Sequence, residues 1–133
     1  MGNRAVVCFD KYDDKSIGYY LHWNGGRDSV ESFLEATRSI MGDRLGDKSY
    51  ARARLAQVIG TFIAGNLSFG IDLCENLDCD NGDNGTYIVD SKTLKITGRK
   101  FHSGPEQKEY DVKEFAGSIL KQVKAAQAAG ERA

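Results

Sequence analysis

The chain has 133 residues, about the size of one domain, and apolar residues make up 41% of it. With a single proline, this composition excludes a disordered or low-complexity chain. Eighteen Lys and Arg residues against 19 Asp and Glu residues give a formal charge of −1, so charge offers no argument for wholesale binding to nucleic acid or to an anionic membrane.

No stretch approaches the roughly 18 consecutive apolar residues that a membrane span needs. Residues 1–10 show neither the apolar core nor the cleavage site of a signal peptide. Both observations predict a cytoplasmic protein. The chain has an odd number of cysteines, Cys8, Cys74 and Cys79, and their spacing does not match that of a disulfide-rich domain. This predicts free thiols in a reducing compartment.

The N-terminal part of the chain has the period-two pattern of a β-hairpin. Residues 4–10 and 17–23 alternate in polarity, are rich in β-branched and aromatic residues, and are separated by a polar, turn-like segment. In the second strand we expect one face to point into the core, namely Ile17, Tyr19, Leu21 and Trp23.

Two helices are predicted next. Asp28, followed three residues later by Glu31, matches the acidic form of a capping box and begins a helix that a glycine then stops. Asp47 or Ser49 can cap a second helix, which runs to about Ala64 and is followed by glycine and asparagine.

From Leu67 onward the apolar period changes from 3.6 to 2, which indicates strands. Strands are predicted at residues 67–74, 86–89 and 94–101, with an acidic loop at residues 75–85. Asp111 and Glu114 form a second capping box that opens a C-terminal helix, and we expect the chain to fray from about residue 124.

The predicted order is therefore β-β-α-α-β-β-β-α. Because consecutive hairpins favour antiparallel pairing, we expect an α+β fold with an antiparallel sheet of about five strands and three helices packed on one face. Nothing divides the chain, so residues 1–133 are predicted to form a single domain.

The first candidate site is the turn between the second strand and the first helix. Glycines before a helix can turn backbone N–H groups toward an anion, an arginine can clamp it, and a tryptophan can stack on a base. The alternative is a tight connection in which the glycines supply positive φ angles and the tryptophan fills the core. The candidate ligand- or partner-binding residues here are His22, Trp23, Asn24, Gly25, Gly26 and Arg27.

The second candidate site is the acidic loop, with Asp78, Asp80 and Asp83 as partner-contacting residues. A calcium loop that starts at Asp78 would need a glycine where Asp83 stands, and a start at Asp80 places Gly82 at a ligand position. A solvated loop or an acidic contact surface fits better than a cation site.

Cys74 and Cys79 with His22 or His102 lack the second close pair of a zinc motif. We therefore expect no metal ion and no cofactor.

The run Tyr20–Gly26, which contains Leu-His-Trp-Asn-Gly-Gly, has Gly2–Val6 upstream and Ser29–Leu34 downstream. Over about the first third of the chain, this pattern resembles a family of small uncharacterised proteins carried by bacteriophages and integrated mobile elements. The resemblance implies a setting, an accessory protein inside an infected bacterium, where inhibitors of host defence such as anti-CRISPR proteins are common. It transfers no catalytic residue.

The leading functional hypothesis is a non-enzymatic binding protein that occludes or sequesters a host protein, namely a defence factor. It is favoured because no nucleophile–base pair, metal motif or phosphate loop is recognisable, while the polar loops offer contact surfaces. A homo-oligomer is compatible with Tyr20 and His22 on the second face of the sheet.

Two other hypotheses belong to different classes. One is a site for a nucleotide or another small phosphorylated ligand at Gly25, Gly26 and Arg27. The other is an acid–base enzyme that uses His22 or His102, partnered by Asp72 or Asp90.

Overall fold

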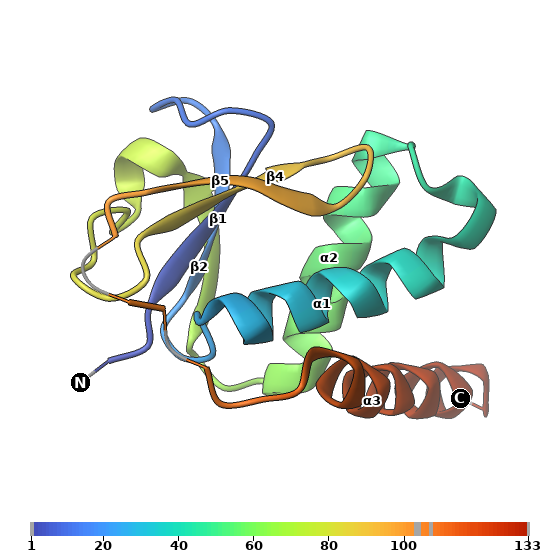
Figure 1. Cartoon of the computed structure of the whole chain (residues 1–133). Helices are drawn as coiled ribbons and strands as arrows, with labels where there is room; N and C mark the ends of the chain where they lie inside the picture. The colour runs from blue at the N-terminus through green and yellow to red at the C-terminus, as the bar shows by residue number, and fades with distance from the viewer. Residues whose placement is uncertain (1, 103–104, 107, 133) are drawn as a thin grey trace.

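The computed structural model describes residues 2–102, 105–106 and 108–132. The chain forms five strands and three α-helices in the predicted order (Figure 1). The elements are β1 (Ala5–Phe9), β2 (Ile17–Leu21), α1 (Arg27–Met41), α2 (Lys48–Ile63), β3 (Phe69–Leu73), β4 (Thr86–Asp90), β5 (Lys95–Lys100) and α3 (Val112–Arg132). The α+β prediction is confirmed.

The five strands form one sheet in the order β3-β2-β1-β4-β5. The prediction of a purely antiparallel sheet is wrong at one pair, because β1 and β4 run parallel, with Val6 opposite Thr86 and Phe9 opposite Val89. Parallel neighbours need a long connection, and here the chain between them includes two helices and β3 before it returns to β1. The other three pairs are antiparallel.

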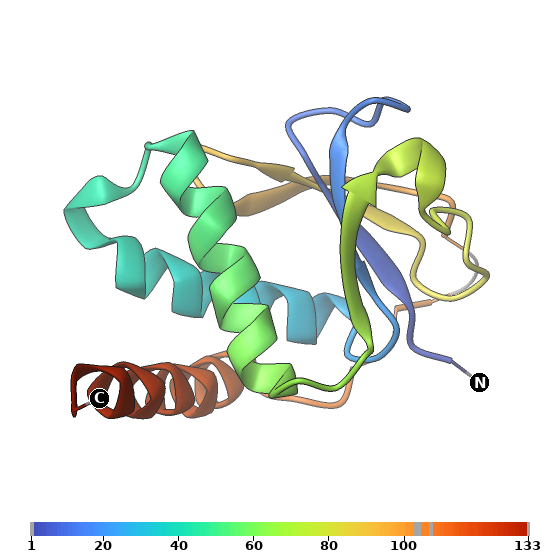
Figure 2. The ribbon, with the colours of Figure 1, turned by 180° about the vertical axis from the view of Figure 1, so that it is seen from behind.

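The helices lie on one face of the sheet in two layers. Helices α1 and α2 pack against the strands, and α3 lies against these helices on the side away from the sheet (Figure 1, Figure 2). The Phe115 ring of α3 packs against Phe33 of α1 and Phe62 of α2, with centroid distances of 6.1 and 5.3 Å. Burying each large apolar side chain of this core contributes about 1.5 to 3 kcal/mol.

The second face of the sheet is covered in part by the acidic loop. Cys74 and Cys79 pack there against Val6 and Cys8 of β1. Asn81 fixes the loop backbone, since its Oδ1 accepts hydrogen bonds from the N–H groups of Asp83 and Gly85 at 3.1 and 3.0 Å. The sheet is therefore buried on both faces around β1.

Two expectations for β2 and α1 are wrong. Ile17 and Trp23 were assigned to the core, but their exposed fractions are 43% and 52%, because they lie at or beyond the ends of β2. Asp28 and Glu31 do not form the predicted capping box, because α1 begins at Arg27 and its N-cap is Gly26. The Asp28 carboxylate binds elsewhere, as described below.

The N-cap residues predicted for the other two helices, Asp47 and Asp111, are confirmed. The Asp47 side chain accepts the Tyr50 N–H at 3.3 Å, and Asp111 accepts the Glu114 N–H at 3.0 Å. Helix α3 continues to Arg132 beyond the expected fraying point near residue 124, since its last turns are rich in the strong helix formers Ala, Lys and Gln. Within the described residues, no helix combines the length and the apolar character that crossing a bilayer requires.

Candidate functional site

The turn from His22 to Arg27 is a tight connection packed against the start of β1. The Gly25 N–H donates to the Asn3 carbonyl oxygen at 2.8 Å, and a Cβ on Gly25 would lie 2.6 Å from that oxygen. The positive φ is at Asn24 (60°), and neither Gly25 nor Gly26 (−65°) has one, so the expectation that these glycines supply positive φ angles is wrong. Gly25 therefore allows the turn to lie close to the backbone before β1, and its N–H is already hydrogen-bonded within the protein.

His22 and Trp23 are exposed beside this turn. The Tyr20 hydroxyl lies 2.9 Å from His22 Nδ1, and the Trp23 ring meets the His22 ring edge-on at 5.0 Å. The Asp72 carboxylate, a partner in the acid–base hypothesis, instead accepts the Leu73 N–H at 2.7 Å and an Asn76 amide hydrogen at 3.0 Å. His22 is thus paired with a phenol.

Arg27 extends from the first turn of α1 to Glu106, which precedes α3. Its Nε lies 2.7 Å from Glu106 Oε2, and the Tyr87 hydroxyl donates to the same oxygen at 3.1 Å. Arg99 Nη1 lies 3.7 Å from Glu106 Oε1, and both guanidinium groups sit over the Tyr87 ring, 5.4 and 5.6 Å from its centroid. We call Arg27, Tyr87, Arg99 and Glu106 the Glu106 cluster.

The charges in the Glu106 cluster shift the pKa values of Glu106 and Tyr87. Burial acts to raise the pKa of Glu106, but the hydrogen bond and the charge of Arg27, with smaller contributions from Tyr87 and Arg99, lower this pKa below its ordinary value. Burial raises the pKa of Tyr87, and the Glu106 charge raises it further. At neutral pH the cluster therefore contains two cations, one carboxylate and a neutral phenol.

Two of the three aspartates predicted to contact a partner bind within the protein. Asp83 Oδ2 accepts hydrogen bonds from Arg4 Nε at 2.8 Å and from the Arg4 backbone N–H at 3.1 Å, and Arg4 Nη1 lies 3.4 Å from Asp78. Asp80 is exposed. Arg4, just before β1, thus holds the acidic loop, and Asp78 and Asp80 remain exposed on it.

The three cysteines are free, as predicted, and they lie together beneath the acidic loop. Cys8 Sγ lies 3.5 Å from the Lys11 carbonyl oxygen, and Cys79 Sγ lies 3.5 Å from that of Cys74. Burial raises the pKa of Cys8 to about 11 and that of Cys74 to about 12, so both remain protonated thiols at neutral pH. Among the described residues, no group of three or more His, Cys, Asp and Glu side chains is placed to hold a metal ion.

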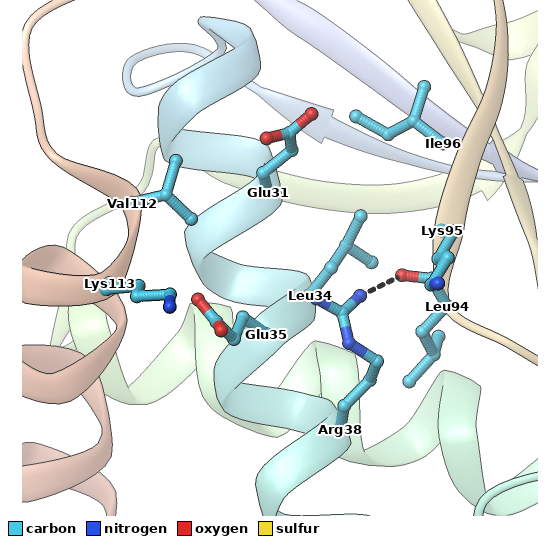
Figure 3. Close-up of a pocket in the computed structure, with 9 residues that line it drawn as sticks. All are labelled: Glu31, Leu34, Glu35, Arg38, Leu94, Lys95, Ile96, Val112 and Lys113. Carbon is cyan, nitrogen blue, oxygen red and sulfur yellow. Dashed lines mark hydrogen bonds between the residues drawn. The ribbon is translucent and has the colours of Figure 1, made fainter.

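A groove of about 400 Å³ runs along α1 between β5 and the start of α3 (Figure 3). Arg38 crosses one side, where Nη1 donates to the Leu94 carbonyl oxygen at 2.6 Å. Figure 3 shows Lys113 and Glu35 pointing toward one another from the two helices. The groove is lined by Glu31, Leu34, Glu35, Arg38, Leu94, Lys95, Ile96, Val112 and Lys113, a mixed set of charges that favours no single ligand class.

Strand β3 forms an open edge of the sheet, visible as the yellow-green strand in Figure 2. The His22 N–H donates to the Ser68 carbonyl oxygen, and the Cys74 N–H donates to that of Ser16, at 2.9 and 2.8 Å. In an antiparallel pair, the N–H and C=O groups of successive residues point alternately toward the partner strand and away from it. Ser68 and Cys74 point toward β2, so the odd-numbered residues between them point their N–H and C=O groups away from β2. Phe69 and Ile71 therefore present their backbone groups outward.

Exposed apolar side chains flank this edge. The exposed fractions of Leu67, Ile71 and Ile17 are 100%, 51% and 43%. The opposite edge, β5, is different, because it carries a register shift and the exposed residues Lys95 and Lys100, features that hinder strand addition. We call residues 67–73 the β3 edge.

Comparisons of the chain with models of protein families, with curated protein sequences and with solved structures find no significant match. The β3 edge was not among the predicted sites, and of the Glu106 cluster only Arg27 was predicted. The alternation from Leu67 to Leu73 indicated a strand, but its position at the edge depends on the topology.

Proposed function

We propose that this protein is a small non-enzymatic binding protein that captures a partner protein by adding a strand of that partner to the β3 edge. The outward backbone groups of Phe69 and Ile71, beside the exposed Leu67 side chain, carry this proposal. In strand addition, backbone hydrogen bonds supply affinity and side-chain contacts supply specificity. The fitting partner segment is extended and presents apolar side chains at alternate positions.

The neighbouring turn extends this surface. The hydrogen bond between His22 and Ser68 places Trp23 at the same end of the sheet as Leu67. The Trp23 side chain is half exposed, and tryptophan is enriched among the residues that dominate binding energy at protein interfaces. The proposal therefore assigns a partner-binding role to His22 and Trp23, the role that their sequence context suggested.

The setting that fits this binding mode is a bacterium that carries a phage or mobile element. The partner is then a host protein of a defence system, which this protein occludes or sequesters in the cytoplasm, as an anti-CRISPR protein would. The resemblance around Leu21–Gly26 supports this setting, and the open edge supports the binding mode.

The decisive variant is Ile71→Pro. The Ile71 N–H points away from β2, so proline there removes a donor that only an added strand would use, and proline is tolerated at such edge positions. The control is Leu45→Lys, which changes an exposed apolar residue in the connection between α1 and α2. The tagged proteins are used to isolate partners from bacterial lysate, which are then identified by mass spectrometry.

A stoichiometric partner that binds the wild type and Leu45→Lys but not Ile71→Pro supports the proposal, provided that the circular dichroism of the variants matches that of the wild type. A partner retained by Ile71→Pro would remove the β3 edge from the function. A dimer in light scattering that Ile71→Pro dissociates would assign the edge to a second copy of this chain instead.

A further inference from the structure

The Glu106 cluster leaves one of its cations poorly satisfied. Arg99 is fixed by its Nε, which donates to the Asn84 carbonyl oxygen at 2.9 Å, and its side chain is only 10% exposed. Its Nη1 is 3.7 Å from Glu106, beyond hydrogen-bonding distance. Among the described residues, the buried Nη2 has no hydrogen-bond partner. This buried donor is therefore available to a further acceptor oxygen.

The charge of the cluster points the same way. Among the described residues, Arg27 and Arg99 share one carboxylate, that of Glu106, and Arg27 has one further acidic contact, Glu31 at 3.7 Å. Arg27 also stands in the first turn of α1, whose positive end favours an anion. A carboxylate offers two oxygens and one negative charge, whereas a phosphoryl group offers three oxygens and nearly two charges.

We propose that Arg27, Tyr87 and Arg99 form a binding site for a phosphoryl group, and that Glu106 occupies this site in the free protein. Two phosphoryl oxygens take the positions of the Glu106 oxygens, and the third reaches Arg99 Nη2. Arginine suits this role because its planar fork of donors matches phosphate geometry.

The surroundings leave room for the rest of such a ligand. A cavity of about 470 Å³ adjoins Arg27. Its charged lining is mixed, since Lys108 and Lys113 stand there together with the acidic residues Asp28, Glu31 and Asp111. The site lies on α1, β4 and β5, whereas the proposed partner surface is at β3 on the opposite edge of the sheet. The two functions can therefore be tested separately.

The test compares phosphate binding by the wild type, by Glu106→Gln and by the double variant Arg99→Gln/Glu106→Gln. Glutamine keeps the size of Glu106 but removes its charge, so the internal competitor is weakened. Inorganic phosphate is titrated at constant ionic strength, with acetate in a parallel titration, and binding is followed by the NMR shifts of the arginine Nε–H groups. We expect Glu106→Gln to bind phosphate at least about tenfold tighter than the wild type does and to prefer phosphate over acetate.

The double variant should lose this gain in phosphate affinity, because the proposed site needs Arg99. A gain caused only by a general effect of salt would persist without Arg99. Equal phosphate affinity in the wild type and Glu106→Gln, or a gain that survives Arg99→Gln, would overturn the proposal. If Glu106→Gln is too unstable to titrate, Glu106→Asp withdraws the carboxylate by one methylene and should show a smaller gain. Wild-type affinity in that variant would equally refute the site.

Discussion

The Asp28 carboxylate in α1 accepts a hydrogen bond from the backbone N–H of Tyr110, 82 residues away, at 2.8 Å. The same oxygen, Oδ2, accepts the Glu109 N–H at 2.5 Å, while Oδ1 accepts the Ser29 N–H at 2.8 Å. One 8%-exposed side chain thus connects the first turn of α1 to the segment that leads into α3. Asp28 thus binds the segment before α3 to α1, although its sequence context predicted a helix cap.

Replacing Asp28 with Ala should lower the free energy of unfolding by about 2 to 3 kcal/mol, because two backbone donors lose their acceptor in a partly buried position. Asp28→Asn keeps one carbonyl oxygen and should cost about 1 kcal/mol. Urea unfolding measures both changes.

The control for this prediction is Asp43→Ala, at an exposed position in the connection after α1, which should stay within about 0.5 kcal/mol of the wild type. Asp28→Ala as stable as Asp43→Ala would show that α3 is positioned by its apolar contacts alone.

Local features of the fold were predictable because the sequence determines them within a few residues. Asp47 and Asp111 cap their helices through contacts three residues away, and the change of apolar period at Leu67 coincides with the return to strands. The parallel pairing of β1 and β4 was not predictable in this way, since no local pattern shows which strand a distant segment joins.

The candidate sites were likewise predictable only where the interacting residues lie close in sequence. Arg27 was selected for anion binding, and it does bind an anionic group, but that group is Glu106, 79 residues away. Tyr87 and Arg99 lie on neighbouring strands with nothing in their sequence context to connect them to Arg27. Asp78 and Asp83 appeared to be surface charges because their partner, Arg4, is more than 70 residues distant.

The close approach at Gly25 predicts a large effect of a single methyl group. Gly25→Ala would place Cβ 2.6 Å from the Asn3 carbonyl oxygen and 2.7 Å from the Ala5 Cβ, so β1 or the turn must shift. We expect a loss of about 2 to 4 kcal/mol in the free energy of unfolding.

The matched control is Gly60→Ala in α2, where an added Cβ meets nothing within 4 Å. It should stabilise the protein by up to about 1 kcal/mol through helix propensity. A tolerated Gly25→Ala would contradict the role of this glycine in close packing.

Asp10 predicts a pH-dependent effect. Burial acts to raise its pKa, but hydrogen bonds from the Ser91 N–H and hydroxyl, together with the charges of Lys48 and Arg52, lower this pKa. A carboxyl group whose pKa is lower in the folded protein stabilises the fold at pH values above its unfolded-state pKa of about 3.9. This stabilisation is lost as the pH falls through the folded-state pKa.

Ser91→Ala removes the hydroxyl donor and should cost about 1 kcal/mol at pH 7. The difference from the wild type should narrow as the pH falls through the folded-state pKa of Asp10, which lies below the unfolded value of about 3.9. Urea unfolding at pH 7 and at successive values from about pH 4 down to the lowest pH at which the protein stays folded tests this. A constant difference over the whole range would show that Asp10 is not the acceptor that matters.

The buried thiols predict slow alkylation in the folded protein. A cysteine with a pKa of about 11, as at Cys8, is ~0.1% thiolate at pH 8, against about a quarter for a peptide cysteine. Because the thiolate is the reacting species, iodoacetamide should modify Cys8 and Cys74 at least about a hundredfold more slowly than it modifies the chain unfolded in urea. Mass spectrometry at timed intervals resolves the sites, and peptide-like labelling of either thiol in the folded protein would mean that the acidic loop opens readily from β1.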